Sequence, residues 1–405
     1  MVASHWYLAT VANPREENYH LDIGSTMEPL AREKPDTPRV CEVIGMESWF
    51  PSYDGKQECR LVGENHQEVI PLRDESNQEK VLESKLPCGI AEAEQLLEQG
   101  VEQQKTRQGE AALQSFKQAL EIFIQLQNQR GVGRTLSGLA LTAYTLGEFP
   151  QAIEYASNSL AIAREVNDQR LEGNVLGILS NSYRHLGDQV KAIEQGQQSL
   201  TLMQQLQDLP GEVATLNNLG LAYKALGDLP RAIKYQRESL KIAQTLNDYQ
   251  TQEQILRNLG NACYATGDYT QAIEYYKQRV AIAQELGDHR LEVHILRNLS
   301  YACSALGDYH QAIEYSQQRL LKAQELGDHR AEEQALGSLG VAYDALGDYA
   351  QAIEYYEKRL RIARLLSDQK LEDRALGSLR VACYALGDYA KVLEYHEQSL
   401  ALRNA

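Results

Sequence analysis

A glycine recurs every forty residues along most of this 405-residue chain, and this period limits the possible folds more than any other feature of the sequence. It occurs seven times without slippage, at Gly147, Gly187, Gly227, Gly267, Gly307, Gly347 and Gly387. An Ala-Leu or Ala-Ile pair keeps the same period from Ala112-Leu113 to Ala352-Ile353 and becomes Val392-Leu393 in the last copy. Because a fixed period of ~20 to 50 residues is typical of solenoids, we predict eight repeats from about Ile90 to the C-terminus.

The residues between these glycines predict two helices in every repeat. In the segment NNLGLAYKALGD the apolar positions share one helix face at i, i+3, i+4 and i+7, namely Leu219, Ala222, Tyr223 and Leu226. The first helix is expected to end at Gly227, because the left-handed residue that ends a helix costs a residue with a side chain roughly 1 to 2 kcal/mol. Asp228 is expected to cap the second helix. A capping-box spacing follows in three copies: Asp268 and Gln271, Asp308 and Gln311, Asp348 and Gln351.

The repeat also carries a family pattern. A Leu-Gly pair is followed by tyrosine three residues later, then by the Gly-Asp turn, and then by an alanine with an aromatic residue four positions on. Examples are Leu219-Gly220 with Tyr223, Leu339-Gly340 with Tyr343, Leu259-Gly260, Ala272 with Tyr276, Ala352 with Tyr356, and Ala112 with Phe116. This pattern resembles the tetratricopeptide repeat (TPR) over residues 90–405. The period is longer than the family's usual thirty-four and is similar to the forty-residue variety of Pins/LGN-type adaptors and bacterial TPR arrays, although the Go-Loco peptides of Pins-like adaptors are not found here.

The resemblance implies an all-α, right-handed superhelical solenoid of about eight helix-turn-helix repeats and sixteen helices. It also implies a scaffold or adaptor for other proteins, in which the first helix of each repeat lines a concave groove that holds a peptide. Short helix pairs cannot bury their own apolar faces, so each repeat must be stabilised by its neighbours. Residues 1–88 show no repeat and form a separate segment.

Counting from the Leu-Gly pair places the expected groove positions. The middle repeats concentrate asparagine and arginine there. An asparagine side chain can donate to and accept from a peptide backbone, and arginine pairs with carboxylates. We therefore predict a groove for an acidic peptide, with the candidate residues Arg184, Asn217, Asn218, Lys224, Arg257, Asn258, Asn261, His294, Arg297 and Asn298.

Two other interpretations of these residues stay open. In the first, some of the asparagines only satisfy contacts between helices or tolerate solvent, since an asparagine before Leu-Gly is common in the family. The carboxylate clamp of chaperone-binding relatives fits Arg257, Asn261 and Asn298, but Gln334 and Ser338 supply no positive charge, so a heat-shock chaperone tail is disfavoured.

Charge and composition exclude several function classes. The net charge is -16, of which -7 falls in residues 1–88 (nine Lys and Arg, sixteen Asp and Glu), and such a chain repels nucleic acid. No apolar run approaches the length of a membrane helix and no secretory signal is found, so we expect a cytoplasmic protein without a membrane partner. The sequence carries no phosphate-binding loop, nucleophile elbow or dinucleotide fingerprint, and no enzyme activity is expected.

Cysteine, histidine and tyrosine fit structural roles. Cys263, Cys303 and Cys383 share one helix register and are predicted to be small buried side chains; Cys41, Cys59 and Cys88 lack metal-ligand spacing. HRLEVH (289–294) does not match a zinc helix, so neither a metal nor any other cofactor is expected. A tyrosine ladder is predicted to pack between repeats, at Tyr155, Tyr235, Tyr275, Tyr315, Tyr355 and Tyr395.

The two ends of the chain suggest a second function. Residues 1–38 are expected to be largely disordered, and residues 60–62 and 68–70 form a candidate hairpin near Trp49 and Phe50. The alternative to the open scaffold is a regulatory or assembly module whose groove is occupied by this N-terminal segment. The last repeat shows Leu393, Leu400 and Leu402 without a capping helix after them. This suggests either a homo-oligomer formed end to end or a further domain that follows in related chains, by analogy with bacterial arrays fused to protease-like domains.

Overall fold

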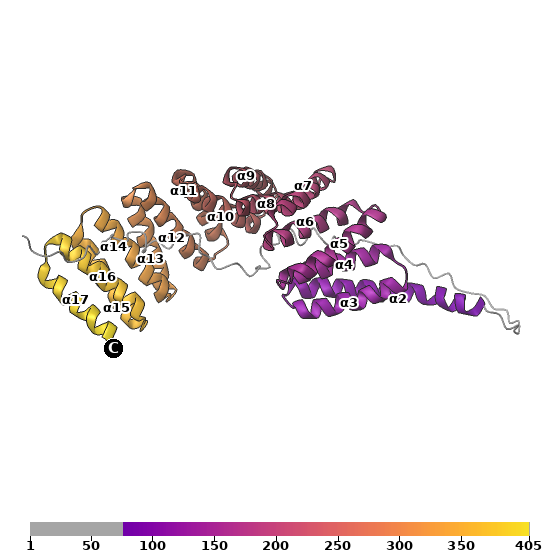
Figure 1. Ribbon diagram of the computed structural model, residues 1–405, viewed down its shortest axis with the longest axis horizontal. Coiled ribbons are helices and arrows are strands. Elements are labelled where there is room, and N and C mark those ends of the chain that lie inside the picture. Colours follow the sequence, from indigo (N-terminus) through magenta and orange to yellow (C-terminus); the bar gives the residue numbers. More distant parts are fainter. Residues whose placement is uncertain (1–75, 405) are drawn as a thin grey trace, which may run out of the picture. The chain divides into compact units, whose positions relative to one another are not determined.

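The computed structural model describes the backbone of residues 76–404 and the side chains of residues 89–403 (Figure 1). This range holds sixteen α-helices and no strand. The first helices of the repeats, which we call the A helices, are α2 (Ser76–Lys105), α4 (Gln129–Thr145), α6 (Gln169–His185), α8 (Leu209–Leu226), α10 (Tyr249–Ala265), α12 (His289–Leu306), α14 (His329–Ala345) and α16 (Gln369–Leu386). The second helices, or B helices, are α3 (Gly109–Gln125), α5 (Phe149–Glu165), α7 (Gln189–Gln205), α9 (Leu229–Thr245), α11 (Tyr269–Glu285), α13 (Tyr309–Glu325), α15 (Tyr349–Leu365) and α17 (Tyr389–Asn404).

The predicted helix pairs are therefore confirmed within the described range. Helix α2 begins at Ser76, upstream of the start that we predicted near Ile90. The expected disordered stretch, the candidate hairpin and Trp49-Phe50 all lie outside the described residues. No helix among residues 76–404 has both the length and the apolar character needed to cross a membrane.

The turn between the two helices of a repeat is built as its glycine predicts. Gly227 has φ 87°, the left-handed region that a glycine enters without steric cost, and it ends α8. The side chain of Asp228 then accepts a hydrogen bond from the backbone N–H of Arg231 (3.0 Å) and caps α9. The left-handed conformation recurs at all seven glycines of the period, and the aspartate cap recurs in every copy except the first, where Glu148 makes no side-chain cap.

The capping boxes are only half formed. Asp268 accepts from the backbone N–H of Gln271 at 3.1 Å, but its own N–H donates to the carbonyl of Cys263 (2.9 Å) and not to the Gln271 side chain. The bonds at Asp308 and Asp348 are the same, to Cys303 and Tyr343. The N–H of each of these aspartates already donates to the backbone carbonyl five residues before it, as in a Schellman motif. The glutamine side chain is therefore not needed to satisfy this N–H.

The core lies between the helices of each repeat and the next A helix. Ala272, Tyr276 and Leu259 are fully buried, and Gly260 makes room for the Tyr276 ring, which would lie 2.4 Å from a Cβ at that position. The three cysteines at 263, 303 and 383 are buried and free, as predicted. Each residue of the tyrosine ladder packs against a buried cluster: Tyr155, Tyr235, Tyr275, Tyr315, Tyr355 and Tyr395.

The A helices also contact one another directly. Helix α4 lies against α2 and α6, α8 lies against α6 and α10, and α12 lies against α14, while each B helix from α3 to α15 packs on the A helices before and after it. We use the name A-helix face for the positions of the A helices in the registers of His294, Arg257, Asn258 and Asn261.

Candidate functional site

All ten predicted site residues lie on four consecutive A helices. Arg184 belongs to α6, three residues to α8, three to α10 and three to α12. Those on α8 are Asn217, Asn218 and Lys224; those on α10 are Arg257, Asn258 and Asn261; those on α12 are His294, Arg297 and Asn298. They differ in the hydrogen bonds that their side chains form with the rest of the chain.

The asparagines divide between helix contacts and unused amide groups. Asn258 donates to the side-chain carbonyl of Asn217 at 3.2 Å, and both are buried, so this pair joins α10 to α8. Asn261 accepts a hydrogen bond from the Tyr276 hydroxyl at 2.8 Å. In contrast, the Oδ1 atoms of Asn218 and Asn298 are buried and have no partner among the described residues. A buried carbonyl without a donor is unfavourable, so each of these two amides is left with an unsatisfied acceptor.

Arg257 and Arg297 occupy one register on adjacent A helices and are half-buried. Neither forms an ion pair with any residue between 89 and 403, and Nε of Arg297 is buried without a partner there. Burial is the main cause that lowers the pKa of Arg279 and of Arg319, and the charges of Arg257 and Arg297, respectively, lower these pKa values further. The two guanidinium groups therefore place unneutralised positive charge on α10 and α12.

His294 lies near the positive charges of Arg297 and Arg319. Its side chain is exposed on one side, but partial desolvation lowers its pKa, and Arg297 and Arg319 lower it further. A neutral imidazole is thus favoured beside these arginines at neutral pH.

Arg184 and Lys224 lie at the edges of the predicted set. A guanidinium N–H of Arg184 donates to Nε2 of His185 at 2.8 Å, and the His185 ring stacks on Phe149 with 4.6 Å between centroids. Burial lowers the pKa of His185 to about 4, and Arg184 contributes to the shift, so the ring is a neutral acceptor. The Lys224 side chain is exposed.

Sequence reasoning missed three buried arginines that reach this region from the B helices. Arg279, Arg319 and Arg359 recur at forty-residue spacing on α11, α13 and α15 and are 5%, 2% and 8% exposed. Arg279 pairs with Glu253 at 2.5 Å and Arg359 with Glu333 at 2.6 Å, in each case with a carboxylate twenty-six residues upstream on the A helix of the same repeat. The recurrence of Arg with Glu at this offset was the signal available in the sequence.

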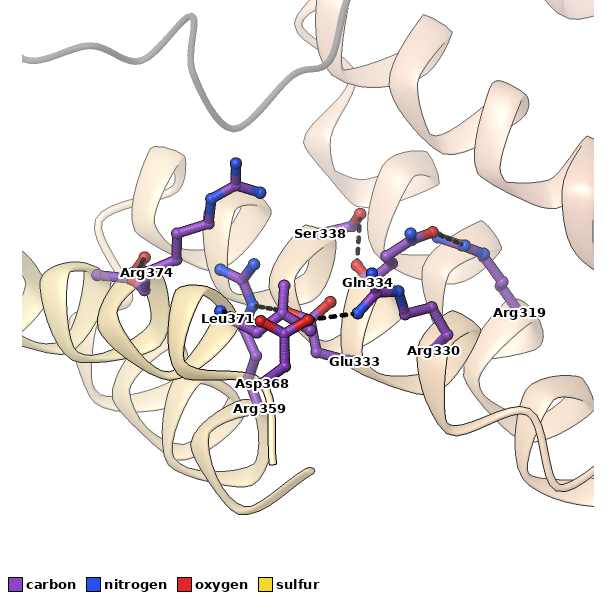
Figure 2. Close-up of polar contacts among 10 residues, drawn as sticks. Arg319, Arg330, Glu333, Gln334, Ser338, Arg359, Asp368, Leu371 and Arg374 are labelled. Atoms are coloured by element: carbon purple, nitrogen blue, oxygen red, sulfur yellow. Dashed lines mark hydrogen bonds and ion pairs between the residues drawn. The ribbon is translucent and has the colours of Figure 1, made fainter. Parts of the chain in front are cut away.

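Arg319 brings positive charge to a place where none was expected. Its Nη2 donates to the side-chain carbonyl of Gln334 at 2.6 Å (Figure 2). Gln334 lies on α14 in the register of His294. Gln334 and Ser338 carry no positive charge themselves, as predicted from the sequence, but the guanidinium of Arg319 reaches Gln334 from α13.

The family comparison covers most of the array. The tetratricopeptide repeat model matches residues 131–205, 171–245, 211–285, 251–320 and 294–365, and a second tetratricopeptide repeat model matches residues 375–405. This chain belongs to the tetratricopeptide repeat family. The comparison with curated protein sequences found no match.

Solved structures show the same fold at low identity. The TPR chain is similar to apo RapI, with 14% identity and a TM-score of 0.56, over 77% of this chain and 97% of that one. It is also similar to a STAND (signal transduction ATPase with numerous domains) protein with a tetratricopeptide repeat sensor from Pyrococcus horikoshii, with 16% identity and a TM-score of 0.55. That match covers 81% of this chain and 48% of the other, so the TPR chain spans about half of that protein. At these identities the likeness shows a TPR-type solenoid.

Proposed function

We propose that the A-helix face of α8, α10 and α12 binds an extended acidic segment of a partner protein. A role as a protein-interaction scaffold follows from the repeat family; the acidic ligand and the residues that hold it are the proposal. The observation that carries it is the pair Arg257 and Arg297, two half-buried guanidinium groups without an ion pair among the described residues. In a chain with net charge -16, such unneutralised cations favour a carboxylate-bearing ligand over a basic one.

The asparagines supply the contacts that charge alone does not give. The Oδ1 atoms of Asn218 and Asn298 lack a donor among the described residues, and a peptide backbone N–H can provide one. Asn217 and Asn258 already bond to each other, so we assign them to the wall that fixes the spacing of α8 and α10. Arg184, Lys224, Asn261 and His294 extend the proposed site on either side of this centre.

A library of random linear peptides, selected on the full-length protein, tests the proposal. We expect the selected peptides to be enriched in Asp and Glu, and the enrichment to vanish on the Arg257→Glu, Arg297→Glu double variant. The matched control is Lys241→Glu with Lys277→Glu, which makes the same charge change at exposed positions of α9 and α11. Selection of basic or uncharged peptides, or equal selection by both double variants, would contradict the acidic groove.

The acidic N-terminal segment is a competing ligand for the same face. It carries sixteen Asp and Glu residues against nine Lys and Arg within residues 1–88. Removing residues 1–75, which precede α2, separates the two possibilities. Tighter peptide binding after the removal indicates self-occupation; unchanged binding indicates an open scaffold.

Association of two copies through the last repeat also stays a prediction. Leu393 and Leu400 on α17 are 64% and 46% exposed, which leaves apolar surface for contact. Sedimentation velocity over a range of concentrations tests it, and a monomer at every concentration would remove this assembly.

A further inference from the structure

Arg319 lacks the partner that its two equivalents have. Arg279 faces Glu253 and Arg359 faces Glu333, whereas the residue twenty-six positions before Arg319 is Val293. Val293 is 2% exposed and packs with Ala323 and Ala331. Among the three repeats that carry a buried arginine, the middle one alone has no carboxylate in this register.

The guanidinium of Arg319 is nevertheless as buried as those of its equivalents. Arg319 is 2% exposed, and its Nε and Nη1 atoms have no hydrogen-bond partner among residues 89–403. Burial lowers the pKa of Arg319 to about 10, with Arg297 adding to the effect and Tyr301, Asp328 and Glu333 opposing it without forming a salt bridge, so the group is still charged at neutral pH. A buried charge with two unpaired donors is strongly unfavourable unless something else compensates it.

This unpaired group lies against the A-helix face. Its single bond goes to the neutral amide of Gln334, a half-buried residue on that face (Figure 2). The equivalent Arg359 shows how far such a side chain reaches, because its Cζ and Nε lie 3.1 Å from where a Cβ would stand on Gly337. Gly337 occupies the register of Arg257 and Arg297. An arginine of this register therefore extends from its B helix to the site proposed for the peptide.

We propose that Arg319 is an anchoring subsite that takes one Asp or Glu side chain of the bound peptide, in the role that Glu253 and Glu333 have in the neighbouring repeats. The inference rests on the proposed function, because it names which part of the acidic peptide is recognised and where. The incoming carboxylate replaces the Gln334 carbonyl as the acceptor for Nη2 and also accepts from Nη1 or Nε. One oxygen for each N–H matches the fork of the guanidinium, and the Gln334 amide rotates aside.

The neighbouring repeats indicate how to fill the subsite from within. Val293→Glu would place a carboxylate in the register of Glu253 and Glu333, where the same chain already holds two buried Arg-Glu pairs. It should pair with Arg319 and exclude the ligand. Val293→Gln is the matched control with nearly the same shape and no charge. Arg319→Ser removes the anchor and introduces the residue that α5, α7, α9 and α17 carry at this register, namely Ser159, Ser199, Ser239 and Ser399.

Fluorescence anisotropy with a labelled oligoglutamate peptide, amidated at its C-terminus, measures the effect on the full-length protein. We expect Val293→Glu and Arg319→Ser each to weaken binding by about thirtyfold or more, the change that corresponds to about 2 kcal/mol for a lost buried charge contact. Val293→Gln should bind like the wild type. Circular dichroism of each variant confirms the helical fold, and Arg319→Ser carries the test if Val293→Glu does not fold.

The outcomes separate this inference from the proposed function. If Val293→Glu and Arg319→Ser bind oligoglutamate like the wild type while Arg257→Glu with Arg297→Glu does not, the anchor is wrong and the acidic groove stands. If none of these variants changes binding, or the wild type does not bind, both are wrong. A matched oligoglutamate with a free C-terminus identifies the carboxylate: binding that requires the free terminus would overturn the assignment to a side chain.

Discussion

The repeats from α4 to α9 and the repeats from α10 to α15 use the same backbone period but join their two helices by different chemistry. We call them the first and the second group of repeats. In α5, α7 and α9 the register of the buried arginines holds a serine, and each hydroxyl donates to a backbone carbonyl of its own A helix at 2.8 Å; the pairs are Ser159 with Gly133, Ser199 with Gly173, and Ser239 with Val213. In α11 and α15 the same register holds Arg279 and Arg359, each bonded to a carboxylate.

This difference shows that the fold does not require charge at the register. A short hydroxyl satisfies the contact in the first group at little cost in desolvation, whereas the second group takes two ions out of water and must compensate them. The second group also contains Arg257 and Arg297, the centre of the proposed site. Two of the buried arginines, Arg279 and Arg319, lie on α11 and α13, the B helices that follow α10 and α12 of the proposed site, and Arg319 is the one of the three that has no salt bridge among the described residues.

The largest effect on stability is expected when one of the buried ion pairs is broken. Glu333 is 1% exposed, and Glu333→Ala would leave Arg359 buried without its carboxylate. We expect a loss of about 3 to 5 kcal/mol in the free energy of unfolding. Urea denaturation followed by circular dichroism measures it, read as the midpoint of the transition, because repeat arrays need not unfold in one step.

The first group of repeats supplies the control. Ser199→Ala removes one hydroxyl and leaves the Gly173 carbonyl inside a helix, so the expected loss is only about 1 kcal/mol. Equal losses in the two variants would break the comparison, because they would show that the buried ions and the hydroxyl contribute alike.

Acid should weaken the first group of repeats through His185. The pKa of this ring is lowered to about 4 by burial and by Arg184, compared with 6.5 in the unfolded chain. Above pH 6.5 the ring is neutral in both states and stability is unaffected. Between pH 6.5 and 4 the unfolded state takes up the proton first, so stability falls as pH decreases.

A thermal-unfolding series over this pH range, on the wild type and on His185→Gln, measures the contribution of the ring. Glutamine keeps a polar side chain but does not titrate, so the variant should lose less stability between pH 6.5 and 4. Identical pH dependence in both proteins would show that His185 is accessible enough to be protonated without cost.

Most of the fold could be predicted because it depends on local, repeated choices. Gly227 was predicted to end its helix from its lack of a Cβ, and Asp228 to cap the next from its side-chain oxygen; both hold in the structure. The burial of Cys263 followed from its register alone. The missing half of the capping box at Asp268 could not be predicted, since it depends on a backbone bond to Cys263 that competes for the same N–H.

The site was harder to predict because it depends on contacts between repeats. The spacing of Asn217 and Asn258 places both on the A helices, but only the packing of α8 against α10 shows that the two amides bond to each other. Because arginine is usually exposed, the sequence alone suggests a surface position for Arg319. Its long side chain instead reaches Gln334 on another helix. A pattern along one helix gives the register of a residue and does not give the place that a flexible side chain reaches.

The central claim, that Arg257 and Arg297 hold the acidic residues of a bound peptide, is tested most directly by a charge swap. A selected acidic peptide and its variant with Lys in place of Asp and Glu are titrated into the wild type and into Arg257→Glu, Arg297→Glu. We expect the wild type to bind only the acidic peptide and the double variant to bind the lysine peptide better than the acidic one. If the double variant keeps the wild-type preference for the acidic peptide, the arginines do not recognise it and the assignment of the site is wrong.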